Sequence, residues 1–315
     1  MRFAWVGMHA EGLPALEALL AAGAPVQAVF TLTPELAAKR SGSADYRPLC
    51  RRFGVPLYFV PDINATAAHA VLRALSPDVV FVIGWHQFVR RETLRLARVG
   101  MIGAHASLLP HNRGSAPINW AIIRGESETG VTLFWLADDP DAGEIIDQVA
   151  FPITPWDTAA TLYDRVACET RAMLLRLLPK LLAGERPARP QMPTDEPPLR
   201  RRRPADGRID WSRSNREIYD FIRALTRPFP GAFSMLDGIT WRIWQAALPP
   251  PQPIEAPPGE ILGPVVSPLS DACGQLVACG EGAIIVLEVE SEDGRVLRGR
   301  ELSAQAWAGR RWVHD

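Results

Sequence analysis

Short apolar runs alternate with amphipathic stretches over residues 1–150, and this alternation constrains the fold more than any other feature of the sequence. It is typical of a parallel sheet with helices on both faces, because each helix returns the chain to the next parallel strand. The run Val79–Ile83 is apolar at every position, which predicts a central strand buried on both faces. The other predicted strands are Phe3–Val6, Val26–Leu32, Pro56–Val60 and Met101–Ala104, and the predicted helices are Gly12–Ala22, Tyr46–Phe53, Ala65–Leu75 and Glu92–Ala97.

Two further strands and a long helix complete this predicted α/β domain. The strands Thr129–Leu136 and Ile145–Phe151 flank a polar turn, and Thr158–Leu182 carries apolar residues at helical spacing. We therefore expect an open, mostly parallel, Rossmann-like sheet with helices on both faces. The glycines after the first strand, Gly7 and Gly12, do not form the GxGxxG pattern that cradles a pyrophosphate, so we expect no NAD.

A cluster of prolines marks the end of this domain. Six of the 29 prolines fall between Pro187 and Pro204, a density that excludes a helix or a central strand. We expect a Pro/Arg-rich linker at residues 187–206, which separates one domain at residues 1–186 from a second at residues 207–315.

The second domain combines one helix with short strands. After the predicted helix Arg216–Leu225, strand-like runs are separated by Gly- and Pro-rich turns, which predicts a small, OB-like β-barrel. These runs are Ala232–Leu236, Thr240–Ala246, Gly259–Val266, Gln275–Ala278 and Ala283–Glu288.

Composition narrows the class of protein. The net charge of −1 argues against a nucleic-acid partner, which usually requires a basic excess, and no apolar run approaches the length of a membrane span. The four cysteines show neither CxxC pairs nor zinc spacing, so we expect reduced thiols, no metal and a cytoplasmic protein.

Two loops carry the candidate chemistry. His105 follows the predicted strand Met101–Ala104, and Asp141 lies in the polar turn between the two later strands. An α/β sheet places its ligands at the carboxyl ends of its strands, and a carboxylate beside an imidazole orients the ring and favours its protonated form. From the residues alone, the two side chains are either an acid–base pair or structural turn residues.

Several motifs around these residues resemble those of the 10-formyltetrahydrofolate-dependent formyltransferases. This family includes methionyl-tRNA formyltransferase and the formyltransferases of UDP-amino-arabinose and other amino sugars. The matching segments are His105–Pro110, Arg113–Gly114, Pro117–Ile122, Gly125–Glu126, Thr129–Thr132 and Asp141–Ile146, followed by Arg202–Trp211 and Arg227–Phe233. The resemblance implies a formyltransferase catalytic domain followed by the C-terminal barrel of the family.

The resemblance also implies how the site works. The family moves a formyl group from N10 of the folate to a primary amine with an Asn–His–Asp trio. His105 matches the histidine, which takes the amine proton or stabilises the oxyanion, and Asp141 matches the aspartate that holds it. The family asparagine, an oxyanion donor, is replaced by Gly103. Three interpretations remain open: Asn112 supplies the missing donor, Gly103 admits a bulkier acceptor, or the chain binds folate with impaired catalysis.

For the N10-formyltetrahydrofolate co-substrate, the resemblance points to backbone groups of Gly84–Phe88 and Leu136–Asp141. Trp85 either stacks on the pterin or packs in the core. The expected cofactor-binding residues are Gly84, Trp85, His86, Leu109, Arg113, Leu136, Asp138 and Asp139.

The amine acceptor is expected to be an amino-sugar nucleotide. The tRNA enzymes carry a Lys/Arg-rich insertion after the second strand, whereas the segment Pro34–Tyr46 here holds two basic and two acidic residues. The alternatives are methionyl-tRNA, another small amine, a formyl-tetrahydrofolate hydrolase and a folate-binding protein without turnover. The resemblance further implies a homodimer, since sugar formyltransferases often pair through their C-terminal parts.

Overall fold

The computed structural model describes residues 1–313, which fold as two compact units. The first unit comprises Met1–Pro117, Glu128–Pro152 and Leu162–Arg200, and the second comprises Ile118–Ser127, Ile153–Thr161 and the described residues from Arg201 onward. Two short segments that precede the Pro-rich stretch therefore group with the second unit. The expected boundaries at residues 186 and 207 stay predictions.

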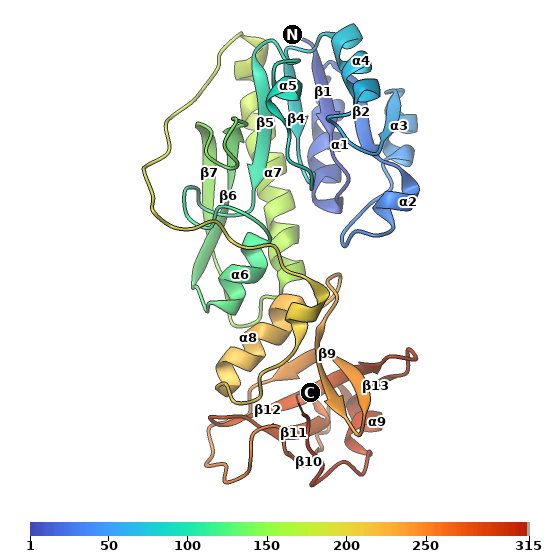
Figure 1. Cartoon of the computed structure of the whole chain (residues 1–315), viewed down its shortest axis with the longest axis vertical. Helices are drawn as coiled ribbons and strands as arrows, with labels where there is room; N and C mark the ends of the chain where they lie inside the picture. Colours follow the sequence, from blue (N-terminus) through green and yellow to red (C-terminus); the bar gives the residue numbers. More distant parts are fainter. Residues whose placement is uncertain (314–315) are drawn as a thin grey trace. The chain divides into compact units, whose positions relative to one another are not determined.

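A mixed seven-stranded sheet forms the centre of the first unit (Figure 1). Its strand order is β3-β2-β1-β4-β5-β6-β7; neighbours from β3 to β5 run parallel, whereas β6 and β7 continue antiparallel. The predicted α/β fold class is thus confirmed. The strands are β1 (Phe3–Val6), β2 (Val26–Leu32), β3 (Leu57–Val60), β4 (Val79–Val82), β5 (Gly100–His105), β6 (Glu128–Trp135) and β7 (Ile145–Pro152).

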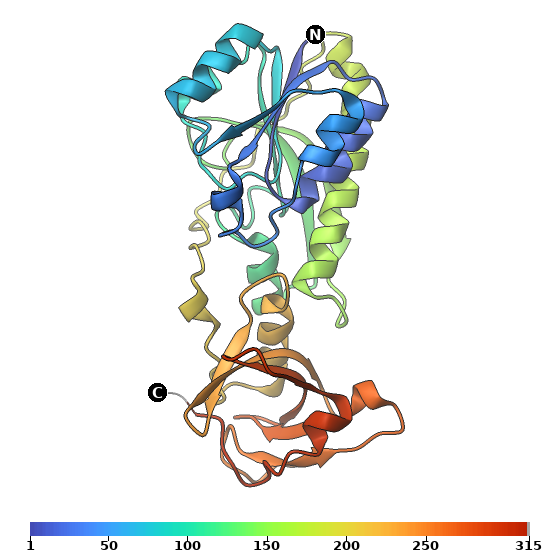
Figure 2. The same cartoon turned by 90° about the vertical axis from the view of Figure 1, so that its right-hand side faces the viewer.

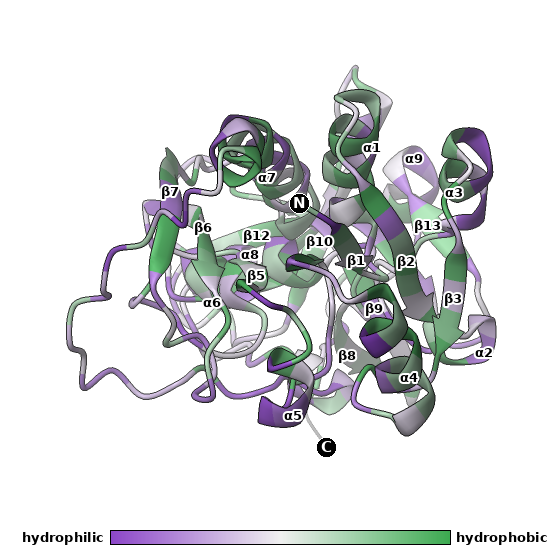
Figure 3. Cartoon of the chain, turned by 90° about the horizontal axis from the view of Figure 1, so that it is seen from above, coloured by the Kyte–Doolittle hydropathy of each residue, from purple (hydrophilic) through white to green (hydrophobic). Residues whose placement is uncertain are grey.

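Helices cover both faces of this sheet (Figures 2 and 3). One face carries α1 (Leu13–Ala21), α3 (Arg47–Phe53) and α7 (Ala159–Leu182), and the other carries α4 (Thr66–Leu75) and α5 (Arg91–Leu94). The central strand β4 is buried along its whole length, as its uniformly apolar sequence predicts.

Alternate residues of the central strands pack into two apolar layers. On one face, Val6 and Val82 join Leu72 of α4 in a buried cluster. On the other face, the rings of Phe3 and Trp5 lie 5.4 and 6.1 Å from the ring of Phe81. Burial of each such side chain contributes about 1.5–3 kcal/mol, so the strand ends are held on a rigid base.

Two short helices of the N-terminal half, α2 (Pro34–Ala37) and α6 (Pro117–Ile123), were not predicted. Both begin with a proline, a residue that is compatible with the first turn of a helix. No helix among residues 1–313 combines the length and the apolar character that a bilayer crossing requires.

The second unit contains an antiparallel sheet of order β10-β11-β12-β9-β8, with β13 paired to β12. Its rings Trp211, Trp307 and Trp312 contact one another in the core, at centroid distances of 5.9 and 6.3 Å. A hydrogen-bonded capping box of Ser214 and Glu217 starts α8. The elements are η2 (Pro204–Gly207), α8 (Asn215–Leu225), β8 (Ala232–Leu236), β9 (Ile239–Ala247), β10 (Ile261–Val265), η3 (Ser270–Ala272), β11 (Gly274–Ala278), β12 (Ala283–Ser291), β13 (Val296–Arg298) and α9 (Gly299–Ser303).

Candidate functional site

His105 and Asp141 lie together in the first unit. His105 is the last residue of β5 rather than the first residue after it, and its Nδ1 is 3.7 Å from Oδ1 of Asp141. The other carboxylate oxygen of Asp141 accepts a hydrogen bond from the Gly114 amide at 2.9 Å. Both side chains are largely shielded, with exposed fractions of 9% and 21%, so their electrostatic interaction is stronger than it would be in water.

Asp141 reaches His105 by an unexpected path. Because β6 runs antiparallel to β5, the turn after β6 starts beside Met101, whose carbonyl accepts the Leu136 amide at 2.7 Å. The turn then folds back toward the end of β5, and Asp141 adopts a left-handed backbone with φ of 55°. The two residues thus meet through a folded-back turn, whereas the sequence suggested two loops at one sheet edge.

The orientation of the His105 ring is set by a main-chain group. Its Nε2 lies 2.9 Å from the carbonyl oxygen of Asn112. A carbonyl only accepts, so Nε2 carries a proton, and Nδ1 of the neutral ring presents its lone pair toward Asp141. At 3.7 Å this second contact is too long for a hydrogen bond. Nδ1 is therefore the atom positioned to take up a proton beside a carboxylate.

Asn112 lies at the site, but its contact with His105 differs from the expected one. The residue is 1% exposed and has a φ of 56°, a conformation that asparagine tolerates better than most residues. It contacts His105 through its backbone carbonyl, which accepts, whereas an oxyanion requires a donor. This contact therefore orients the base and does not replace the family asparagine.

The space beside Gly103 is filled. A Cβ at this position would lie 2.6 Å from Cδ2 of Leu136 and 3.1 Å from the ring of Phe134. Apolar side chains thus occupy the volume into which an asparagine side chain would extend. The interpretation that Gly103 opens room for a bulkier acceptor does not fit this geometry.

Three of the expected folate-binding residues have structural partners. The carbonyl of Gly84 accepts from the amides of Met8 and His9, and a Cβ at Gly84 would lie 2.8 Å from that of His9. Leu109 is buried, and its amide donates to Oγ1 of Thr132. The Leu136 amide donates to the carbonyl of Met101 in β5. The side chains of Leu109 and Leu136 are part of the packing around the site.

The remaining expected residues surround the same region. Trp85 packs partly buried against the apolar cluster under α4, with its ring 5.7 Å from that of His86. Asp138 is exposed and pairs with Arg91 at 3.0 Å, and the carbonyl of Asp139 accepts from Ala142. The guanidinium of Arg113 donates to Oε1 of Gln191 in the Pro-rich segment.

Some polar groups near these loops remain available for a ligand. Within the part of the chain that the structure describes, the indole Nε1 of Trp85 is buried without a hydrogen-bond partner. The backbone amides of Trp85 and Ala137 also lack one among residues 1–313. Trp85 and Leu136 pack against the apolar cluster under α4, and donors beside such apolar side chains suit the carbonyl and ring nitrogens of a pterin, so the residues present fit a folate.

The loop after β1 contributes two groups that sequence reasoning missed. The amide of Glu11, in η1 (Ala10–Gly12), donates to Nδ1 of His9 at 3.3 Å, and Oε2 of Glu11 lies 3.6 Å from the same nitrogen. Among the described residues Oε2 has no hydrogen-bond partner. Burial raises the pKa of Glu11, while electrostatic interactions with the His9 and His105 rings act in the opposite direction, which indicates that Glu11 lies in the neighbourhood of His105.

The observed strand order places this loop at a position typical of ligand binding. Strands β2 and β4 lie on opposite sides of β1, which makes the β1–β4 boundary a topological switch point. Ligands of open α/β sheets bind at such points. In the sequence, the missing GxGxxG motif argued against NAD at this loop and gave no sign of another ligand.

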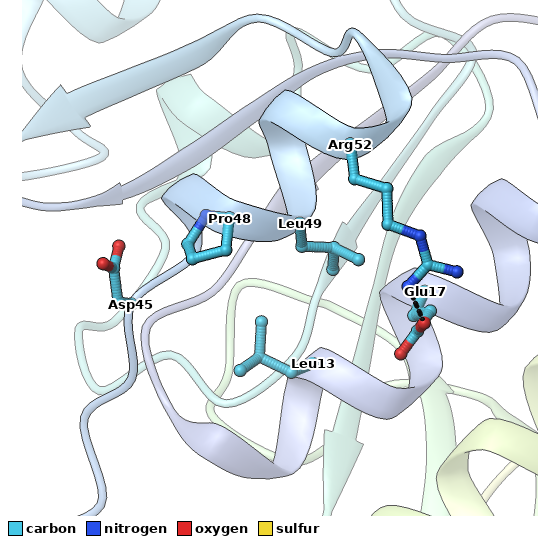
Figure 4. Close-up of a pocket in the computed structure, with 6 residues that line it drawn as sticks. All are labelled: Leu13, Glu17, Asp45, Pro48, Leu49 and Arg52. Carbon is cyan, nitrogen blue, oxygen red and sulfur yellow. Dashed lines mark hydrogen bonds and ion pairs between the residues drawn. The ribbon is translucent and has the colours of Figure 1, made fainter.

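A surface hollow elsewhere in the first unit holds none of the expected site residues. It lies between α1 and α3, and an ion pair of 2.6 Å between Arg52 and Glu17 borders it (Figure 4). Its lining is Leu13, Glu17, Asp45, Pro48, Leu49 and Arg52. No group there is placed for catalysis. The residues that the structure describes also contain no cluster of three His, Cys, Asp or Glu side chains fit for a metal.

Comparison with known proteins places this fold. HypX from Aquifex aeolicus, solved in complex with tetrahydrofolic acid, shares 19% identity with a TM-score of 0.66 over 95% of this chain, which spans only 46% of HypX. WlaRD, a sugar 3N-formyl transferase solved with dTDP and 5-N-formyl-THF, shares 16% identity with a TM-score of 0.65 over 94% of this chain and 99% of its own. The N-formyltransferase from Helicobacter canadensis, in complex with folinic acid and dTDP-3-aminofucose, shares 18% identity with a TM-score of 0.65 over 91% and 98%. At identities below 20%, these similarities show that this chain shares the fold of the three proteins.

Two family models match the sequence itself. The formyl transferase model covers residues 23–178, and the model of the formyl transferase C-terminal domain covers residues 202–306. Together they account for most of both units and for the order of the two domains along the chain. The chain therefore belongs to the formyl transferase family.

Proposed function

We propose that this protein transfers a formyl group from N10-formyltetrahydrofolate to a primary amine, with His105 and Asp141 as the catalytic pair. The observation that carries the proposal is the arrangement of His105, whose Nε2 is fixed by a carbonyl and whose Nδ1 faces a shielded carboxylate. A base with one nitrogen anchored and the other free is suited to accept and return a proton.

The chemistry follows from the charges that must move. The neutral amine attacks the formyl carbon, forming a C–N bond and a tetrahedral oxyanion, and Nδ1 of His105 takes the proton that the amine loses. The same proton passes to N10 as its bond to the formyl carbon breaks, which releases tetrahydrofolate and the formamide. The Asp141 carboxylate stabilises the intervening imidazolium. General acid–base catalysis of this kind contributes about 10²–10⁴ in rate.

The folate is assigned to the loops around Trp85 and Ala137. Their unpartnered amides and the Trp85 indole support this placement. His86, Asp138, Asp139 and Arg113 border the same loops and remain candidates for contacts with the rest of the molecule.

The proposed acceptor is an amino-sugar nucleotide. One similar structure is named a sugar 3N-formyl transferase, and another is an N-formyltransferase solved in complex with dTDP-3-aminofucose; this chain matches both over nearly their whole length. The net charge of −1 and the near-neutral segment from Pro34 to Tyr46 support a small-molecule acceptor over transfer RNA, because a phosphate backbone attracts a basic surface.

The test measures tetrahydrofolate release from 10-formyltetrahydrofolate, with and without amines. The panel contains dTDP-3-aminofucose, other amino-sugar nucleotides, methionyl-tRNA and small amines. We expect release only with an amino-sugar nucleotide. Release without any amine would show a hydrolase, methionyl-tRNA dependence would overturn the acceptor, and folate binding without release would overturn the catalytic proposal.

A further inference from the structure

The Pro-rich segment at residues 187–199, here named the strap, is hydrogen-bonded to both loops of the candidate site. It runs as an extended chain beside β6 and β7 (Figure 1). Although its prolines exclude a helix or a strand, they leave side chains and isolated backbone groups free to bond. The sequence predicted a linker at this place, and the structure shows a segment that also belongs to the surroundings of the site.

On one side, the strap holds the turn that carries Asp141. Backbone groups of Arg189 and Ile145 exchange two hydrogen bonds of 2.8 Å. The side-chain amide of Gln191 donates to the carbonyl of Asp141 at 2.8 Å and to that of Gly143 at 2.7 Å. The main chain that directly follows the Asp141 side chain is therefore tied to one strap side chain.

On the other side, the strap holds the loop that orients His105. Oε1 of Gln191 accepts from the guanidinium of Arg113 at 2.6 Å. The amide of Leu199 donates to the Arg113 carbonyl at 2.7 Å, and its carbonyl accepts from Ser115 at 3.1 Å. Farther along, Oε2 of Glu196 lies 2.7 Å from Nδ1 of His111, next to Asn112.

The approach of the strap explains a glycine in this loop. A Cβ at Gly114 would lie 2.5 Å from the carbonyl oxygen of Leu199, and the residue has a φ of 105°. The Gly114 amide is also the donor to Asp141. The strap, the His105 loop and the Asp141 turn thus meet at one point.

We propose that Gln191 is a positioning residue that fixes the Asp141 turn against the His105 loop. This inference rests on the proposed function, since it assigns Gln191 a part in keeping the His105–Asp141 pair aligned. A single side chain thus joins the two loops: Gln191 donates to the carbonyls of Asp141 and Gly143 and accepts from Arg113. A displacement of about 1 Å at a reacting pair costs about 10² in rate.

The Gln191 side-chain amide has a donor half, the NH₂ group that bonds the two carbonyls, and an acceptor half, the oxygen that bonds Arg113, and substitutions can remove them separately. In Gln191→Glu, the carboxylate still accepts from Arg113 but has no N–H for the two carbonyls. In Gln191→Leu, both halves are lost at similar volume. The neighbour Met192 is 74% exposed, so Met192→Ala is the matched control on the same segment.

The experiment uses the full chain and has two readouts. In steady-state assays with the active amine, Gln191→Leu and Gln191→Glu are expected to lower kcat about 10- to 100-fold, while KM for 10-formyltetrahydrofolate changes less than about threefold. The ring ¹⁵N resonances of His105, recorded without substrate, are expected to shift in both variants and stay in place in Met192→Ala.

The outcomes separate this inference from the proposed function. Unchanged kcat and unchanged His105 resonances in both Gln191 variants would overturn the positioning role, whatever happens to the melting temperature. If the unmodified protein formylates no amine, the proposed function fails, and the His105 resonances still decide whether Gln191 orders the pair. Should Gln191→Leu not fold, Gln191→Glu provides both readouts.

Discussion

Two loops of the first unit each carry a carboxyl group, and the surroundings of the two groups are opposite: Asp141 lies 3.7 Å from His105 and has a backbone donor, whereas Glu11 lies beside His9 and is buried. In the Asp141 turn, one oxygen accepts a backbone amide and the other faces Nδ1 of His105. In the Glu11 loop, Oε2 is buried with no hydrogen-bond partner among residues 1–313, and burial raises its pKa. Carboxyl groups in contrasting environments are a common way to give two acids in one site different roles. Asp141, which lies 3.7 Å from His105 and has a backbone donor, is therefore the carboxyl group that we propose acts on His105.

The two loops are also held in place by different forces. The Glu11 loop is packed: a Cβ on Gly7 or Gly12 would lie 2.9 or 2.7 Å from the hydroxyl of Tyr46. The Asp141 turn depends on hydrogen bonds from Gln191 and Gly114. Packing distributes its energy over many contacts, whereas a few hydrogen bonds are lost with a single side chain. The Asp141 turn is therefore the one that substitution displaces more easily.

The largest effect that separates the two loops is expected from Asp141→Asn. The amide keeps the shape of the side chain but removes the charge that stabilises protonated His105, so kcat should fall about 10²- to 10⁴-fold. Steady-state kinetics with the active amine measures this loss, with Glu144→Gln, at an exposed surface ion pair of the same turn, as the control. Equal activity of Asp141→Asn and the unmodified protein would remove the assigned difference between the two carboxyl groups.

A smaller effect is expected from Gly103→Asn, which restores the family residue beside the Asp141 turn. Because Leu136 and Phe134 fill the space, the side chain overpacks the site and the free energy of unfolding should fall by about 1–3 kcal/mol. We expect no gain in rate. Urea unfolding and kinetics check both points, and adding Leu136→Ala should recover part of the activity. A faster, equally stable Gly103→Asn would mean that the site tolerates the asparagine in this setting.

The smallest effect is expected in the stability of Glu11→Gln. Burial places the folded-state pKa of Glu11 above its ordinary value of 4.5. The folded state therefore favours the protonated acid, and this contribution is complete below about pH 4.5 and lost as the pH rises through the folded-state value. Glutamine does not ionise, so Glu11→Gln should gain stability relative to the unmodified protein between about pH 4 and pH 7.

Urea unfolding at both pH values measures this difference, and Glu92→Gln, a substitution at an exposed position, is the control. A stability difference that does not change with pH, or that changes in the opposite direction, would show that Glu11 is ionised in the folded protein at no cost. The contrast between the two loops would then disappear.

The sequence predicted the sheet because apolar periodicity reports burial directly. Val26–Leu32 is observed at its predicted bounds, and the uniformly apolar β4 lies at the centre of the sheet. The β6–β7 turn could not be traced in this way, since its return toward His105 depends on contacts with residues more than 25 positions away.

The site was predictable only in part. Family resemblance indicated His105 and Asp141, which the structure brings together. Asn112 was one of three open interpretations of Gly103; its backbone carbonyl contacts His105, and a donor role for its side chain stays a prediction. Proline content identified the segment of Gln191 as a linker, because composition excludes regular structure without revealing side-chain bonds. Glu11 had no motif, and only the observed strand order places its loop at a ligand-binding position.

The most direct test of the account is a single-turnover measurement of formyl transfer by His105→Ala. The protein is loaded with 10-formyltetrahydrofolate, mixed with the amine found active in the panel, and tetrahydrofolate is followed over time. The account predicts a rate at least about 10²-fold below that of the unmodified protein, with folate binding retained. A His105→Ala protein that transfers the formyl group at the unmodified rate would contradict it.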